Sequence, residues 1–432
     1  MSTLGGGGQA AEARATADNW QSPPFNRWAF WHVKQILPTL PIPRPTRPSR
    51  QLISAEAPDV ANDVTVTCVD GSVATVGHVM TRTSTDAYIV MHDGALVAEW
   101  YAPEGAPDRT HAVMSVTKSV VGCVAAALVD RNLLDTDRPV TEYVPELASG
   151  GYAGATVRHV LDMRSGVRFR EDYLDPEAEV RVLGRLVGPV PQPGAPSPLG
   201  MYEYLAGLSA EAPHGRRFLY RSAETDVLGW VCERAAGKPM AELISTLIWQ
   251  PLGAESDAEI MCDGIGTAVH DGGMCATARD LARFGQMLLD GGSVPDEGTG
   301  RRSVIGSRWL REAWAVDADV RSAFAASPAE MSMPGGWYRN QFWFRPGPYG
   351  DVLLCQGIYG QMIHVTRRTR TVCVKLSSWP EPQNPGYLHD TLRAFDAIAG
   401  ALAGRPSAGT NPRQPGVIAG SSRHGTSDRS GK

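Results

Sequence analysis

Hydrophobic and polar positions follow different patterns along the chain, and each pattern predicts a different element. Two β-type runs on either side of a His-Asp-Gly turn predict an antiparallel hairpin over residues 86–101. Residues 114–134 are apolar on nearly every side, which predicts a helix that runs through a hydrophobic core. Three further β runs and a last helix are expected at residues 352–356, 362–366, 371–376 and 389–402.

The middle of the chain has a different character. Residues 136–270 are richer in helical patterns, for example at 240–249, and contain a proline-rich loop at 188–198. An amphipathic helix is expected at 280–290, where a glycine pair ends it. Because the β runs lie towards both ends, we expect the α/β (α+β) class: an antiparallel sheet flanked by helices, with an inserted mainly helical domain.

This order also predicts the domain boundaries. Residues 38–48 are rich in Pro and Arg, so they are expected to form an extended arm, which neighbouring tryptophans hold against a surface. The expected parts are an N-terminal extension packed on the surface (1–60), a sheet domain (61–135 and 271–404), the inserted helical domain (136–270) and a disordered tail (405–432).

Composition narrows the class of partner. The 432 residues are 43% hydrophobic and carry a formal net charge of -5, which excludes a disordered chain. The mild acidity argues against nucleic acid or a membrane surface as the main partner and favours a small-molecule substrate, while a homodimer stays open. Residues 1–18 lack the pattern of a secretory signal. Seven cysteines without paired metal spacing predict a cytoplasmic protein with reduced thiols and no metal site.

The first candidate for chemistry is a serine and a lysine one helical turn apart. Ser115 and Lys118 stand at the start of the predicted core helix, where a three-residue offset places both side chains on one face. A lysine there can act as the serine's base if burial and positive potential lower its pKa. The alternative is a helix cap at Ser115 beside a lysine that reaches solvent. Only five of the 41 basic residues are lysines, and arginine cannot replace a base.

Two further segments carry groups that suit acyl transfer. Tyr220 and Ser222 precede a helical pattern, and a phenol near a lysine ammonium loses its proton more easily, so Tyr220 is a shared or alternative base. Alone, Tyr220 would instead be a core tyrosine. In residues 355–361 a β run meets two glycines, where backbone can approach a ligand, although a bulge or an ordinary turn has the same signature.

Together these motifs resemble a known superfamily. Met114-Ser-Val-Thr-Lys-Ser119, Tyr220-Arg-Ser222 and Gly357-Ile-Tyr-Gly-Gln361 are similar, in order and separation, to the three motifs of the penicillin-recognising serine hydrolases. This superfamily contains the class C β-lactamases and DD-peptidases, so a β-lactamase/DD-peptidase-like fold is expected. Within it, segments such as Glu171-Asp-Tyr-Leu-Asp-Pro176 and Thr225-Asp-Val-Leu-Gly-Trp230 resemble the 6-aminohexanoate-dimer (nylon-oligomer) hydrolases with carboxylesterase activity.

The resemblance implies a role for each matching residue. Ser115 would be the nucleophile, Lys118 its base and Tyr220 the acid and base for the leaving group and the deacylating water. The backbone N–H groups of Ser115 and Ile358 would form the oxyanion hole. Tyr173 matches a tyrosine on a mobile loop that hydrogen-bonds an amide nitrogen. The resemblance implies no metal or organic cofactor, and the remaining candidate substrate-binding residues are Ser222, Asp271, Gly357 and Tyr359.

Departures from the family pattern bear on substrate choice. The Lys-Thr/Ser-Gly triplet of β-lactamases falls on Cys355-Gln356-Gly357, so the cation that clamps a β-lactam carboxylate is missing. Gly184 and Asp271 stand where the nylon-oligomer hydrolases have Asp and Asn, which weighs against amide more than ester activity. The expected function is hydrolysis of short linear amides or esters through an acyl-enzyme. The alternatives are a β-lactamase or DD-peptidase, and a catalytically silent binding relative.

Overall fold

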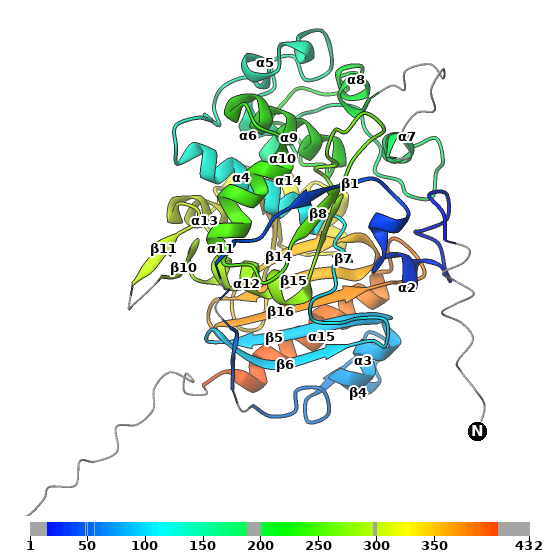
Figure 1. Cartoon of the computed structure of the whole chain (residues 1–432), viewed down its shortest axis with the longest axis vertical. Helices are drawn as coiled ribbons and strands as arrows, with labels where there is room; N and C mark the ends of the chain where they lie inside the picture. The colour runs from blue at the N-terminus through cyan, green and yellow to red at the C-terminus, as the bar shows by residue number, and fades with distance from the viewer. Residues whose placement is uncertain are drawn as a thin grey trace, which may run out of the picture.

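The computed structural model describes residues 15–47, 49, 51–55, 57–187, 200–296 and 300–404. The predicted tail (405–432) and the whole of the predicted proline-rich loop (188–198) lie outside these residues. Within them, the main sheet has eight strands, with neighbours in the order β12 (Trp337–Arg339), β13 (Phe342–Arg345), β14 (Val352–Gly357), β15 (Gln361–Thr366), β16 (Thr371–Ser377), β5 (Thr85–His92), β6 (Ala95–Tyr101) and β2 (Ile53–Ser54) (Figure 1).

This sheet joins the two ends of the chain, as the sequence predicts. β5 and β6 form the expected hairpin, and Asp93 and Gly94 turn it with positive φ angles of 48° and 81°. β16 pairs antiparallel with β5, which places Val374 opposite Ile89. The pairing is antiparallel throughout except at the edge, where the short β2 runs parallel to β6. The expected α+β class is confirmed, with this one parallel pair as a difference.

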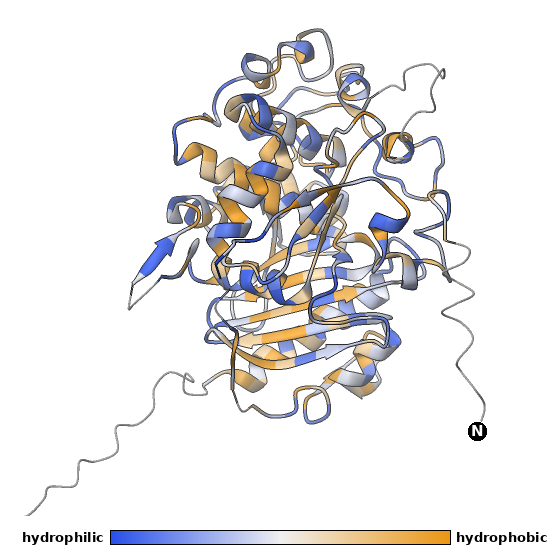
Figure 2. Cartoon of the chain, in the orientation of Figure 1, coloured by the Kyte–Doolittle hydropathy of each residue, from blue (hydrophilic) through white to orange (hydrophobic). Residues whose placement is uncertain are grey.

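Helices cover both faces of the main sheet. α15 (Pro385–Leu402) and α3 (Val76–Arg82) lie on one face, and α12 (Ala278–Leu289) packs on the other against β5, β15 and β16 (Figure 1). Gly285 of α12 allows this close packing, because a Cβ atom there would lie 2.5 Å from Cγ1 of Val372. The central strands and the helix α4 are largely hydrophobic in Figure 2, as expected for elements buried between layers.

The helices of residues 140–252 gather above the sheet around α4 (Val116–Val129) (Figure 1). Residues 116–128 of α4 are all buried, which agrees with the prediction of a core helix. Residues 240–249, where a helical pattern is expected, form α10 followed by a π-helical segment. Pro251 lacks an N–H and its ring crowds the carbonyl of the preceding turn, which favours a widened helix before it. In full, the helices of residues 140–252 that gather around α4 are α5 (Val140–Tyr143), η2 (Pro145–Ser149), α6 (Val157–Leu161), α7 (Glu179–Leu186), α8 (Met201–Ala206), α9 (Ser222–Ala236), α10 (Met240–Leu243), η3 (Ile244–Trp249) and α11 (Gln250–Leu252).

A smaller four-stranded sheet ties the N-terminal arm to the rest of the molecule. Its order is β1 (Thr39–Ile42), β8 (Ala258–Met261), β9 (Met274–Ala276) and β7 (His111–Ala112). β1 comes from the proline-rich arm and lies at an edge, where missing N–H donors are tolerated. Trp20, Phe30 and Trp31 of the extension are buried, so these aromatic residues pack down as expected.

The remaining elements flank these layers. They are α2 (Asn26–Ala29), η1 (Val33–Gln35), β3 (Thr65–Thr67), β4 (Val73–Thr75), β10 (Ser293–Pro295), β11 (Arg301–Ser303), α13 (Ser307–Trp314), α14 (Ala318–Ala325), η4 (Pro328–Met331) and η5 (Ile358–Gly360). In the part of the chain that the structure describes, no helix has the length and apolarity needed to cross a membrane.

Candidate active site

Ser115 lies at the junction between β7 and the central helix. The chain leaves β7 through Met114, whose backbone has a positive φ of 47°, and Ser115 is the residue that precedes the first turn of α4. Ser115 is 8% exposed and lines a cavity of about 320 Å³. The N–H groups of Val116 and Thr117 donate to the carbonyls of Val113 and Met114. The Ser115 N–H has no such acceptor among the described residues, so it can bind an oxygen in the cavity.

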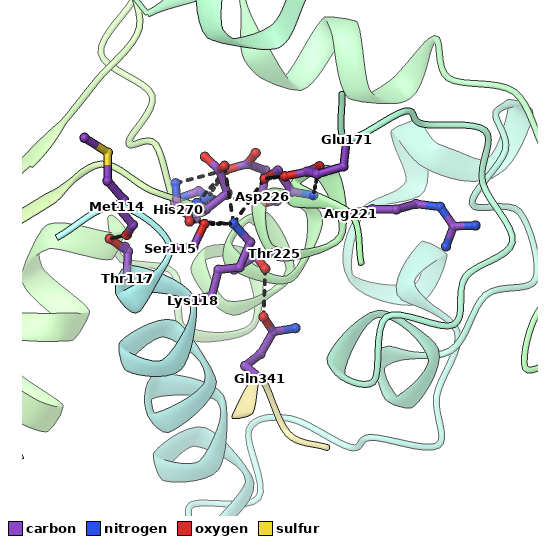
Figure 3. A network of polar contacts seen from close by, with 12 residues as sticks. Met114, Ser115, Thr117, Lys118, Glu171, Arg221, Thr225, Asp226, His270 and Gln341 are labelled. Atoms are coloured by element: carbon purple, nitrogen blue, oxygen red, sulfur yellow. Dashed lines mark hydrogen bonds and ion pairs between the residues drawn. The ribbon is translucent and has the colours of Figure 1, made fainter. Parts of the chain in front are cut away.

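Lys118 lies one turn along α4 and is 1% exposed. Its Nζ donates to Ser115 Oγ at 2.8 Å, to Ser222 Oγ at 3.1 Å and to the Asp271 carbonyl oxygen at 2.7 Å. Figure 3 shows Lys118 pointing at Ser115 in the centre of this network. The Asp271 carboxylate is a fourth, longer contact, with its Oδ2 at 3.5 Å. An ammonium group has three N–H donors, so this set of acceptors fits a charged Lys118.

The charges around Lys118 correct one expectation. A base at this position was expected to have a lowered pKa. Burial does lower it, but Tyr220, Asp271, Glu171 and Asp226 together outweigh burial, so that the pKa of Lys118 lies above its ordinary value. Among these groups, Asp271 forms an ion pair with Lys118, with its Oδ2 3.5 Å from Nζ. The surrounding charges therefore favour the ammonium form of Lys118.

Tyr220 stands beside this lysine at the cavity wall. The Lys118 Nζ lies 5.2 Å from the centroid of the Tyr220 ring, and the ring packs against Trp343 with centroids 4.9 Å apart. Burial raises the pKa of Tyr220, while the positive charge of Lys118 opposes that rise. Ser115, Lys118 and Tyr220 are thus brought together from α4 and from the segment before α9.

Glu171 is a site residue that the sequence analysis did not select. Its Oε1 accepts hydrogen bonds from Ser222 Oγ at 2.6 Å and from the Tyr173 hydroxyl at 2.5 Å. Its Oε2 accepts from the Ser222 N–H at 2.9 Å. Glu171 and Tyr173 both line the cavity. Tyr173 is therefore at the site as expected, although its hydroxyl binds Glu171 here and not a substrate amide.

A buried carboxylate completes the polar network behind Lys118. Asp226 of α9 accepts hydrogen bonds at Oδ1 from the N–H groups of His270 and Asp271, both at 3.0 Å. These bonds fix the backbone of residues 270–271, and hence the carbonyl that Lys118 binds (Figure 3). Burial raises the pKa of Asp226 well above its ordinary value, and the neighbouring Asp271 adds to the rise. Asp271 and Ser222 thus act on Lys118; neither belongs to the cavity lining.

The end of β14 approaches Ser115 more closely than any side chain permits. A Cβ atom on Gly357 would lie 2.7 Å from the Val113 carbonyl oxygen and 3.0 Å from the Ser115 nitrogen. The sequence interpretation of close backbone approach at this glycine therefore agrees with the structure. Ile358, the next residue, lines the cavity with Ser115.

Tyr359 lies elsewhere than expected. Its positive φ of 61° turns the chain, and its ring packs edge-on against Phe30 with centroids 5.3 Å apart. Tyr359 is 5% exposed and belongs to the hydrophobic core. The structure therefore does not bring this predicted substrate-binding side chain to the cavity.

We expect Gly357→Ala to lower kcat for ester hydrolysis about 100-fold. The added methyl group would push β14 away from Ser115 and so misplace the backbone N–H groups that face the cavity. Steady-state kinetics with p-nitrophenyl butyrate measure this. Gly207→Ala is the matched control, because its Cβ atom would meet its nearest neighbour at an ordinary 3.5 Å. Equal effects of the two changes would contradict the prediction.

The cavity wall is mainly apolar and carries no positive charge. Among the described residues that line it there is no Lys or Arg, and Glu171 is the only carboxylate. A neutral acyl chain fits such a wall, whereas a substrate carboxylate would find no cationic partner on it. The apolar and aromatic lining residues include Phe218, Leu219, Tyr220, Met333, Trp343, Ile358, Met362, Trp379 and Leu388.

The fold and this serine–lysine–tyrosine cluster define a class, the serine hydrolases of the β-lactamase type. The beta-lactamase family model matches residues 73–397, so the chain belongs to the beta-lactamase family. The superfamily resemblance drawn from the motifs is therefore confirmed.

Individual relatives within this family show which of its members the chain is similar to. The chain is 38% identical over 403 residues to the 6-aminohexanoate-dimer hydrolase of Paenarthrobacter ureafaciens, covering 90% of this chain and 96% of that protein. It is 31% identical to esterase EstB of Burkholderia gladioli over 38% of this chain and 43% of that one. A Bacillus anthracis structure, named as a candidate 6-aminohexanoate-dimer hydrolase, superposes with a TM-score of 0.79 at 25% identity, covering 90% of this chain and 98% of that one.

Proposed function

We propose that this hydrolase cleaves ester and amide bonds of short linear substrates through an acyl-enzyme on Ser115. The observation that carries the proposal is the 2.8 Å contact between Lys118 Nζ and Ser115 Oγ at the wall of an apolar cavity, with Tyr220 beside it. The relatives named as a 6-aminohexanoate-dimer hydrolase and as an esterase support the same two bond types.

In the proposed cycle, Ser115 Oγ attacks the substrate carbonyl carbon while its proton passes to Lys118 or Tyr220. The N–H groups of Ser115 and Ile358 stabilise the resulting oxyanion; both residues line the cavity where this charge develops, which supports the assignment. The proton then passes to the departing alcohol or amine. Water, deprotonated by the same groups, attacks the acyl-enzyme and releases the acid. No step in this cycle requires a metal or an organic cofactor.

Fluorophosphonate labelling tests whether the chain is an active serine hydrolase. A nucleophilic Ser115 forms a stable phosphonyl ester, which mass spectrometry locates on the peptide that contains residue 115. Kinetics on matched esters and amides, including the 6-aminohexanoate linear dimer, then give the preferred bond. A chain that stays unlabelled and hydrolyses none of these substrates would instead be a silent binding relative.

We expect nitrocefin turnover to be at least about 100-fold slower in kcat/KM than p-nitrophenyl butyrate turnover. The carboxylate of a β-lactam would enter a cavity whose described lining holds no Lys or Arg, and burial of an unpaired charge is costly. Absorbance assays with both substrates on one preparation measure the ratio. Nitrocefin turnover close to ester turnover would favour the β-lactamase alternative.

We also propose that the protein works in the cytoplasm. All seven cysteines are free and buried in the structure. Thiols that stay unpaired are typical of reducing compartments, which supports this location.

A further inference from the structure

We propose that Glu171 is the proton acceptor that frees Lys118 to act as a base, through a relay across the Ser222 hydroxyl. The inference rests on the proposed roles of Ser115 and Lys118 and adds a residue to which no role has been assigned. Glu171 acts through Lys118 and does not touch the reacting atoms, so we describe it as a positioning residue.

The relay is visible in the direction of the hydrogen bonds. Lys118 Nζ donates to Ser222 Oγ at 3.1 Å, and the same hydroxyl donates to Glu171 Oε1 at 2.6 Å. Each donor therefore already faces the acceptor that its proton would move to. The Ser222 N–H and the Tyr173 hydroxyl hold the carboxylate in this position with two further bonds. Lys118 and Ser222 are 1% exposed, so bulk water is a poor substitute for the relay.

The proton transfer balances without any added reactant. One proton moves from the Lys118 ammonium to Ser222 Oγ, and the proton originally on Ser222 moves to Glu171 Oε1. Lys118 becomes a neutral amine, Glu171 a neutral acid, and Ser222 is unchanged. Rotation about the Cε–Nζ bond then aims the amine lone pair at Ser115, whose proton it takes as Oγ bonds to the carbonyl carbon.

The electrostatics of the site make a local proton acceptor necessary. Tyr220 and three carboxyl groups, Glu171 among them, hold the pKa of Lys118 above its ordinary value, so the neutral amine has to arise by proton transfer within the site. Burial raises the pKa of Glu171, while Lys118 and the hydrogen bonds from Ser222 and Tyr173 oppose that rise. Transfer converts the buried Lys118 ammonium and the half-buried Glu171 carboxylate into neutral groups, which lowers the cost of removing these charges from water.

The relay has a definite signature in the pH profile. Protonation of Glu171 from solution abolishes the acceptor, so wild-type kcat/KM falls on the acid side with an apparent pKa above the ordinary glutamate value of 4.5 and is level above it. Without the relay, Lys118 loses its proton only at high pH. Activity would then keep rising with pH up to and beyond the ordinary lysine value of 10.5.

Glu171→Gln and Ser222→Ala test the relay in the full-length protein with p-nitrophenyl butyrate. Each should lower kcat/KM at pH 7 about 100-fold and convert the level profile into one that rises through pH 9, and the double variant should be no slower than either single variant. The control is Glu177→Gln, which removes an exposed carboxylate from the same loop.

Three outcomes would overturn the relay while leaving the proposed function intact. One is a Glu171→Gln rate within threefold of wild type at pH 7. The second is a Glu171→Gln pH profile of kcat/KM that differs from the wild-type profile only in an acid limb at lower pH. This would indicate that Glu171 influences Lys118 by its charge alone. The third is a uniform loss with the wild-type profile, which would indicate a structural role. If Ser115→Ala keeps full activity in the same assay, the proposed function itself fails.

Discussion

Replacing Ser115 by alanine is expected to lower kcat/KM for p-nitrophenyl acetate by at least about 10⁴-fold, because the acyl-enzyme can no longer form. The fold should survive. Lys118 keeps its hydrogen bonds to Ser222 and to the Asp271 carbonyl, and removing one hydroxyl opens little space. Initial rates, together with a thermal unfolding curve, measure both effects. Residual activity should come only from the oxyanion hole and substrate binding.

The control for this change is Ser332→Ala. Ser332 lines the same cavity but belongs to the segment after η4, outside the hydrogen-bond network of Lys118. Its kcat/KM should stay within about threefold of wild type, and the fluorophosphonate probe should still label it. A Ser115→Ala protein that hydrolysed the ester at the wild-type rate would exclude Ser115 as the nucleophile.

The prediction of the site depended on patterns that are local in the sequence. Ser115 and Lys118 are one turn apart, so helical geometry alone placed them together, and the structure shows the contact. Gly357 could be read in the same way, since a glycine at the end of a β run signals close backbone approach. The sheet could be predicted because short apolar runs rich in β-branched residues mark its strands and the hairpin fixes the first pairing.

Other features depend on contacts that no local pattern encodes. Glu171 lies 51 residues from Ser222 in the sequence, and only folding shows that its two carboxylate oxygens bind that serine. From the sequence, a role in this segment was assigned only to Tyr173, and Glu171 was not considered as a site residue. The pKa of Lys118 was misjudged for a similar reason: the helix start and apolar wall were visible, whereas the surrounding carboxylates came from distant segments.

Lysine scarcity was a useful but incomplete signal. It pointed to Lys118 but gave no reason to single out Lys375, which is fully buried. Its Nζ donates to Ser377 Oγ at 2.6 Å, and burial lowers its pKa to about 7. Lys375 is on β16, which is buried along its whole length. A lysine within a β run normally marks the solvent-facing side of a strand, so nothing in the sequence indicated that this lysine is buried.

Lys118→Arg is expected to lower kcat/KM for the same ester at least about 10³-fold, although the charge is retained. A guanidinium stays protonated at any working pH, so it can neither take the proton of Ser115 nor pass one to Ser222. It is also larger and planar, in a position that is 1% exposed and bonded to three separate acceptors. The exposed Lys238→Arg, where the side chain pairs with Glu242 on the surface, is the matched control and should leave the rate unchanged.

Chemical rescue separates loss of the base from loss of packing at this position. Lys118→Ala should be as slow as Lys118→Arg, but it leaves space next to Ser115 for a small primary amine. Added n-propylamine should then restore part of the rate to Lys118→Ala, more strongly as pH rises towards the pKa of the amine, because only the neutral form is a base. It should restore nothing to Lys118→Arg or to Ser115→Ala/Lys118→Ala. Because base and nucleophile act as one unit, this double variant should be no slower than Ser115→Ala alone, and a clearly additive loss would contradict the pairing.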